Sequence, residues 1–283
     1  GEAKAVPLAL VKRAHTNPLK ITLITGASLG NDLDKQLTEA GVLARRLPFQ
    51  VDNTLRKAIN NGEVMFIDQH LSETVEQMRN LQLKKPDVAI SEAVAITEDG
   101  GIIPTTSVGN SASFAIFAEK VIVEINTNLS PAFEGLHDIY IPTYRPTRQP
   151  IPLTQVDERI GTHAINIDPA KIVGIVINND LHDSPSTVTA PDDETQGIAD
   201  HLIAFFEKEV AEERLPKNLG PLQAGIGSIA NAVLTGLKDS NFEDLVMYSE
   251  VLQDCTFELI DAGKMKFASG SSITLSAKYG EKV

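Results

Sequence analysis

The sequence predicts an α/β fold with two domains that are built on mainly parallel sheets. Short apolar runs rich in β-branched residues recur along the chain, and such runs are typical of strands buried on both faces of a sheet. These runs alternate with segments of helical length, which favours parallel strands joined by helical crossovers. A chain of 283 residues is also long enough to bury more than one core.

The first domain is expected to cover residues 1–180. Its expected strands are 21–25, 64–67, 88–90, 121–125 and 172–177. Its expected helices are 3–14, 31–44, 53–60, 71–82 and 111–118. Residues 131–150 contain four prolines and few periodic apolar positions, so we interpret them as an ordered surface excursion.

The second domain is expected to cover residues 190–283, after a break that is rich in Pro, Ser, Thr and Asp. Its clearest helix begins at acidic residues near Asp192, which suit the positive end of a helix, and ends before Pro216. The apolar residues of this helix form a stripe along one of its faces: Ile198, Leu202, Phe205, Phe206 and Val210. Because the chain begins with Gly1 and stops soon after a strand-like segment, we expect it to be a fragment of a longer polypeptide.

The charge balance argues against a nucleic-acid partner. The chain has 38 acidic and 25 basic residues, a formal net charge of −13, whereas phosphate binding needs clustered Lys and Arg. No apolar run approaches the roughly 18–20 residues that span a bilayer, so we expect no membrane partner. The six histidines are scattered without metal-ligand spacing, so we expect no metal site.

The single cysteine, Cys255, excludes a disulfide within the chain and favours a cytoplasmic location. It follows a predicted strand and is expected on the next helix. We interpret it as a small buried apolar residue rather than as a reactive thiol.

The most informative segment is 221–254, which has the pattern strand, glycine turn, helix (229–237), strand (245–249) and then Glu250. Residues 225–230 fit the pattern G-x-G-x-x-A, and a glycine turn at a helix start presents N–H groups to an oxyanion or a phosphate. Glu250 lies twenty residues after Ala230, where a Rossmann domain places its ribose-binding acid. The residues alone therefore leave three readings open: a structural turn, an NAD-type nucleotide site using Gly225, Gly227 and Glu250, or a catalytic carboxylate.

Several long motifs in this order resemble a known family. The sequences GIGSIANAV and MYSEVLQD look like the paired signature of the acetyl-CoA hydrolase/transferase family, which belongs to the class I CoA-transferases. The resemblance continues in AKAVPLAL, TGASLG, EDGGIIPTTSVGNSASF, VIVEIN with PAFEGLHDI, and RLPKNLGPLQAGIG. It implies two CoA-transferase-like (NagB/RpiA-like) domains, of which the second is incomplete, because the family's chains are considerably longer.

The resemblance implies an acyl-CoA:carboxylate CoA-transferase in which Glu250 is the nucleophile. The family's glutamate attacks the acyl-CoA thioester and passes through a mixed anhydride to a glutamyl-CoA thioester, which a second carboxylate then attacks. The Ile226 backbone N–H matches an oxyanion donor. The CoA-contacting loop matches Gly225, Ile226, Gly227, Ser228 and Ile229. Acetyl-CoA hydrolysis, in which water attacks the intermediate, is the alternative.

A second family loop, which faces the acyl site, matches Gly26, Ala27 and Ser28, although a plain structural turn is an equal explanation there. The expected partners are acyl-CoA and small carboxylates such as acetate and succinate, with coenzyme A as a substrate and no permanently bound cofactor. The missing part of the family's chain supplies further CoA contacts, so we do not expect this fragment by itself to turn over efficiently. The preferred acyl group and any homo-oligomer are left open.

Overall fold

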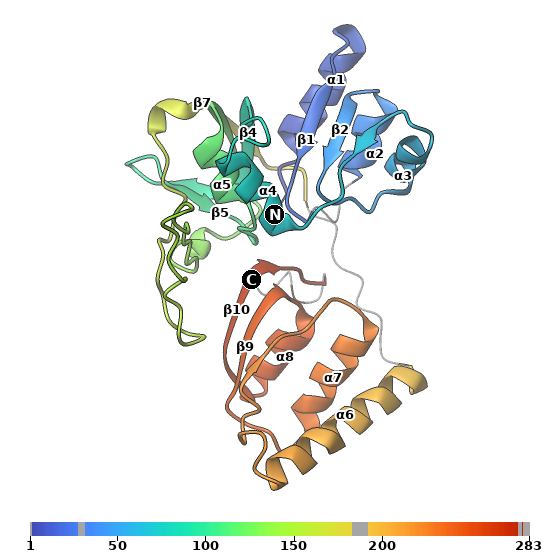
Figure 1. The fold of residues 1–283 in the computed structure, drawn as a ribbon, viewed down its shortest axis with the longest axis vertical. Coiled ribbons are helices and arrows are strands. Elements are labelled where there is room, and N and C mark those ends of the chain that lie inside the picture. Colours follow the sequence, from blue (N-terminus) through green and yellow to red (C-terminus); the bar gives the residue numbers. More distant parts are fainter. Residues whose placement is uncertain (1, 28–31, 183–191, 277–278, 280–283) are drawn as a thin grey trace. The chain divides into compact units, whose positions relative to one another are not determined.

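The computed structural model describes residues 2–27, 32–182, 192–276 and 279. They form two compact units (Figure 1). Unit 1 comprises Gly1–Ile151 and Gly161–Ser184, and unit 2 comprises Pro152–Ile160 and Pro185–Val283. The division into family domains over 1–180 and 190–283 stays a prediction.

Unit 1 contains two sheets. The first sheet is parallel, with the order β1-β2-β3, and is formed by β1 (Ile21–Ile24), β2 (Leu43–Leu47) and β3 (Met65–Phe66). After β3 the chain forms α4 (Leu71–Arg79), which contacts α5 (Ser111–Phe117) beside the second sheet. The helices of the first sheet are α1 (Ala5–Thr16), α2 (Leu33–Glu39) and α3 (Asn53–Asn60). A core of buried aliphatic side chains joins them: Ala14, Leu37, Val42, Leu43, Leu55, Ala58 and Val64.

The second sheet of unit 1 has the order β5-β4-β6-β7. It contains β4 (Val88–Ile96), β5 (Ile102–Pro104), β6 (Lys120–Asn126) and β7 (Ile172–Asn178), with α5 (Ser111–Phe117) and two 3-10 turns, η1 (Pro131–Phe133) and η2 (Pro169–Lys171). Strands β4, β6 and β7 are parallel, and β5 returns antiparallel to β4. Small side chains of α5, such as Ala112 and Ala115, allow it to pack closely on this sheet.

The buried carboxylate of Glu124 on β6 accepts hydrogen bonds from the N-terminal backbone of α1. Its Oε1 accepts hydrogen bonds from the backbone N–H groups of Lys4 (2.8 Å) and Ala5 (2.9 Å), and its Oε2 accepts one from Val6 (3.0 Å). A helix leaves its first N–H groups without partners and carries a positive charge at that end, so a carboxylate stabilises it. Nearby, Lys4 Nζ pairs with Glu92 on β4 at 2.6 Å.

Unit 2 is a parallel three-stranded sheet with helices. It consists of α6 (Asp193–Ala211), β8 (Pro221–Leu222), α7 (Ser228–Asp239), β9 (Leu245–Leu252), α8 (Asp254–Asp261) and β10 (Met265–Ile273). The strand order is β10-β9-β8. The helix predicted from the acidic start and the apolar stripe is α6, where Asp192 and Thr195 form a capping box. Buried residues of β9, α7 and α8, including Met247, Leu237 and Leu259, make the core.

The structure differs from the sequence expectations at several of these elements. The helix predicted over 31–44 ends at Glu39, because Gly41 takes a left-handed conformation (φ 66°) and the chain then enters β2 at Leu43. The short strand β5 was not expected, and because it pairs antiparallel with β4, the second sheet of unit 1 is mixed rather than wholly parallel. The strand predicted over 245–249 continues to Leu252, so Glu250 lies within β9.

Candidate functional site

The glycine turn between β8 and α7 presents backbone N–H groups to solvent. Gly227 precedes α7 with φ 144° and ψ 170°, a conformation that favours glycine, so this position explains one glycine of the motif. Within the described part of the chain, the Ile226 N–H has no hydrogen-bond acceptor. The Ile226 side chain is 58% exposed. The turn can therefore present N–H groups to an anionic oxygen at the positive end of a 12-residue helix.

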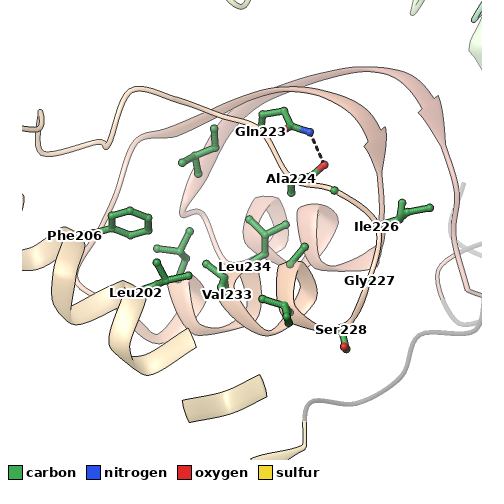
Figure 2. A pocket seen from close by; sticks show the side chains of 14 residues that line it. Leu202, Phe206, Gln223, Ala224, Ile226, Gly227, Ser228, Val233 and Leu234 are labelled. Carbon is green, nitrogen blue, oxygen red and sulfur yellow. Dashed lines mark hydrogen bonds between the residues drawn. The ribbon is translucent and has the colours of Figure 1, made fainter. Parts of the chain in front are cut away.

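An apolar groove of about 550 Å³ adjoins this turn. Figure 2 shows Leu202 and Phe206 of α6 facing Val233 and Leu234 of α7, with Gly227 and Ser228 at the turn. The remaining lining residues are Leu222, Gln223, Ala224, Gly225, Ile226, Ile229, Ala230 and Leu237. A groove of this size and composition is within the range of small-molecule sites.

Glu250 lies on the neighbouring strand, β9, with its side chain exposed. Side chains alternate between the two faces of a strand. Leu245, Met247 and Ser249 are buried on the face that packs against α7 and α8, so Glu250 belongs to the opposite face. Among the residues that the structure describes, no donor reaches the Glu250 carboxylate; its backbone carbonyl accepts a bond from Ser271 Oγ at 2.9 Å.

The pairing of β8 with β9 places the start of the glycine turn beside the strand that bears Glu250. Leu222 pairs with Met247, and the register beyond it sets Ala224 level with Ser249. Ser249 Oγ donates to the Ala224 carbonyl at 3.0 Å and accepts from the Ala224 N–H at 3.4 Å. Sequence reasoning missed Ser249, because no local pattern shows that its hydroxyl meets a residue 25 positions earlier.

The position of Cys255 disfavours its thiolate form. It is the second residue of α8, is 6% exposed, and its Sγ donates to Asn231 Oδ1 at 3.5 Å. Burial raises the pKa of the Cys255 thiol to about 11. The prediction of a buried cysteine on this helix is confirmed, and its lack of reactivity stays a prediction.

The second predicted loop lies in unit 1, after β1. The chain bends at Gly26 and Ala27, and a Cβ on Gly26 would lie 3.9 Å from the backbone N of Asn110, which precedes α5. Ser28 lies outside the described residues. The role of this loop in holding a carboxylate stays a prediction.

Two negative findings apply to the described residues only. No group of three His, Cys, Asp or Glu side chains there is arranged to hold a metal ion. No helix in the same part of the chain has both the length and the apolar character needed to cross a membrane.

Comparison with known proteins identifies the family. Residues 1–177 match the model of the acetyl-CoA hydrolase/transferase N-terminal domain. The chain is 45% identical over 278 residues to a succinyl-CoA:acetate CoA-transferase from Clostridium kluyveri, covering 98% of this chain and 52% of that protein. It is 44% identical over 292 residues to an acetyl-CoA hydrolase from Schizosaccharomyces pombe, covering 100% of this chain and 56% of that protein. The chain thus spans about half the length of the curated relatives it matches.

Solved structures support the predicted fold. RipA from Yersinia pestis matches with a TM-score of 0.67 at 17% identity, over 98% of this chain and 59% of that one. A 4-hydroxybutyrate CoA-transferase from Porphyromonas gingivalis matches with a TM-score of 0.58 at 17% identity, over 99% of this chain and 64% of that one. The α/β fold with mostly parallel sheets is therefore confirmed. The chain belongs to the acetyl-CoA hydrolase/transferase family.

Proposed function

We propose that this chain supplies the nucleophile and part of the CoA site of an acyl-CoA:carboxylate CoA-transferase. The observation that supports this best is the exposed Glu250 carboxylate, which has no donor among the described residues. The strand that bears it pairs with β8, which leads to the Ile226 N–H, and that N–H has no acceptor among the same residues. A carboxylate with free lone pairs can attack a thioester, and a nearby N–H can stabilise the oxyanion that forms.

The proposed reaction proceeds in four acyl transfers. A Glu250 oxygen attacks the acyl-CoA carbonyl and the C–S bond breaks, which gives a mixed anhydride and CoA thiolate. The thiolate attacks the glutamyl carbonyl, so the donor carboxylate leaves and a glutamyl-CoA thioester remains. The acceptor carboxylate then attacks that thioester and expels CoA thiolate, which finally attacks the acyl carbonyl of the new anhydride. The products are a new acyl-CoA and a regenerated Glu250 carboxylate.

The glycine turn has two proposed tasks. The Ile226 N–H donates to the oxyanion of each tetrahedral intermediate; removing one donor of this kind typically costs about 3–4 kcal/mol of transition-state stabilisation. Gly225, Ile226, Gly227, Ser228 and Ile229 contact CoA, and the apolar groove beside them offers apolar surface to its arm. We further propose that Gly26, Ala27 and Ser28 hold a carboxylate substrate.

Hydrolysis of acetyl-CoA is the second candidate, and the naming of relatives such as the Schizosaccharomyces pombe protein as acetyl-CoA hydrolase favours it. Both reactions share the first two steps. They differ in whether water or a second carboxylate attacks the glutamyl-CoA thioester, which depends on how well the site excludes water.

A cytoplasmic location and a homo-oligomeric state remain predictions for the natural protein.

The proposal is tested by intact-mass measurement of the natural polypeptide that contains this chain, after brief exposure to acetyl-CoA. We expect a CoA-sized increment that maps to the Glu250 peptide and is absent from Glu250→Gln. A chase with acetate or succinate should convert the adduct to acyl-CoA faster than water releases free CoA; the reverse order would support the hydrolase. Folded protein without any adduct would contradict the covalent mechanism.

A further inference from the structure

Ser249 is a polar residue on an otherwise apolar face of β9. Leu245 and Met247, on the same face, are fully buried, and Ser249 itself is only 8% exposed. A buried hydroxyl destabilises a protein unless it is hydrogen-bonded. Both bonds of the Ser249 hydroxyl go to one residue, Ala224, through its carbonyl (3.0 Å) and its N–H (3.4 Å).

These two bonds lie where the backbone ladder between β8 and β9 has stopped. The last backbone pair is Leu222 with Met247, and the chain then leaves the sheet to form the glycine turn. Ser249 therefore provides through its side chain the connection that strand pairing no longer provides. Gln253, just after β9, adds a weaker contact, from Nε2 to the Gly225 carbonyl at 3.4 Å.

The position of this connection matters because of what adjoins it on each side. Ser249 directly precedes Glu250, and Ala224 lies two residues before Ile226. The turn itself contains Gly225 and Gly227, whose backbone has more conformational freedom than that of other residues. A turn of this composition needs an anchor if its N–H groups are to stay at a constant distance from the strand that bears Glu250.

We infer that Ser249 is a positioning residue that holds the Ile226 N–H and the CoA-contacting turn at a set distance from Glu250. The inference rests on the proposed function, because Glu250 and Ile226 are assigned their roles there. Ser249 does not touch the reacting atoms. Its hydroxyl acts through Ala224, and it preorganises the oxyanion donor before the substrate arrives.

Replacing this hydroxyl should reduce the chemical steps more than substrate binding. In the natural polypeptide, Ser249→Ala should lower kcat about 10- to 100-fold, because a displacement of about 1 Å can cost about 10²-fold in rate. The KM for acetyl-CoA should change less than about threefold, since most of the CoA surface contacts other groups. Ser249→Thr restores the hydroxyl and should recover kcat to within about threefold of wild type.

Ser240 offers a matched control in the same unit. Its Oγ also donates to a carbonyl, that of Leu237 at 2.7 Å, and accepts from a backbone N–H, that of Phe242 at 3.2 Å. It follows the C-terminal end of α7, about 18 Å of helix away from the turn. Ser240→Ala should therefore leave kcat unchanged while losing the same kinds of bond.

The outcomes separate this inference from the proposed function. Wild-type kcat in Ser249→Ala overturns the positioning role, as does a Ser249→Thr variant with wild-type Tm but the low kcat of Ser249→Ala. If either variant is unstable, Ser249→Cys decides: it keeps the side-chain size but offers only a weak donor, so unchanged kcat overturns the inference. Glu250→Gln is assayed in parallel, and retained turnover in that variant overturns the proposed function instead.

Discussion

Glu124 in unit 1 and Glu250 in unit 2 are two glutamates at similar places in their sheets. Each lies on a strand with a parallel neighbour on both sides, β6 between β4 and β7, and β9 between β10 and β8. Glu124 is 0% exposed and accepts bonds from the first N–H groups of α1 and from Asn178 Nδ2 at 3.2 Å. Glu250 is exposed, and no described residue donates to its carboxylate.

The difference shows what distinguishes a structural carboxylate from a candidate nucleophile. The lone pairs of Glu124 are used by backbone N–H groups, so this side chain joins α1 to the β4–β7 sheet. A buried charge is tolerated when such partners surround it. Among the described residues nothing donates to the lone pairs of Glu250, as its proposed role in attacking an electrophile requires. The two sequences, VIVEIN and MYSEVLQD, do not show this difference in exposure by themselves.

The largest expected effect is on activity and concerns Glu250. Glu250→Gln should lower turnover about 10³-fold or more, because an amide cannot replace the proposed nucleophile. It should leave the free energy of unfolding within about 0.5 kcal/mol of wild type, as is usual for exposed positions. Steady-state assays and chemical denaturation measure the two quantities. Glu243→Gln, an exposed glutamate of the same unit, is the control and should change neither; retained turnover in Glu250→Gln would contradict the proposed role.

The opposite pattern is expected at Glu124. Glu124→Gln should destabilise unit 1 by about 3 kcal/mol, because the variant loses a buried charge that accepts several bonds at the start of α1. Hydrogen exchange of a peptide covering α1 should speed up, whereas peptides of unit 2 should be unaffected. Glu98→Gln, at an exposed position of unit 1, is the control. Equal exchange in the two variants would show that Glu124 does not hold α1.

The smallest effect concerns Cys255, whose buried thiol contrasts with the exposed carboxylate of Glu250. Burial raises its pKa from 9.0 to about 11, so the folded state holds this proton more tightly than the unfolded state. The contribution of the protonated Cys255 thiol to the free energy of unfolding is therefore fully present below pH 9 and is lost as the pH rises through about 11. At pH 8 a thiol reagent should label the folded protein far more slowly than the denatured one. Rapid labelling of folded protein would show that the thiol is accessible after all.

The elements that the sequence predicted well are those with local signals. The helix expected over 53–60 is α3, Asn53–Asn60, because Asp52 precedes it and caps its N-terminus. The signal for the helix that begins near Asp192 is equally local, since its capping box lies within four residues. Strands β2 and β5 were not found, because β2 follows α2 after a short turn and β5 has only three residues, paired with β4.

The sequence by itself determined the α/β alternation, the glycine turn, and the spacing of Glu250 from it, because helix caps, β-branched runs and glycines act on neighbouring residues. Only the tertiary structure decided that the Glu124 carboxylate is buried and hydrogen-bonded whereas Glu250 is exposed. It also decided that the Ser249 hydroxyl forms a hydrogen bond with Ala224. Those facts depend on strand register and on the N-terminus of α1 meeting a strand about 120 residues away. The physical reason is that hydrogen bonds and burial arise between segments that are distant in the chain, and no local pattern encodes such pairings.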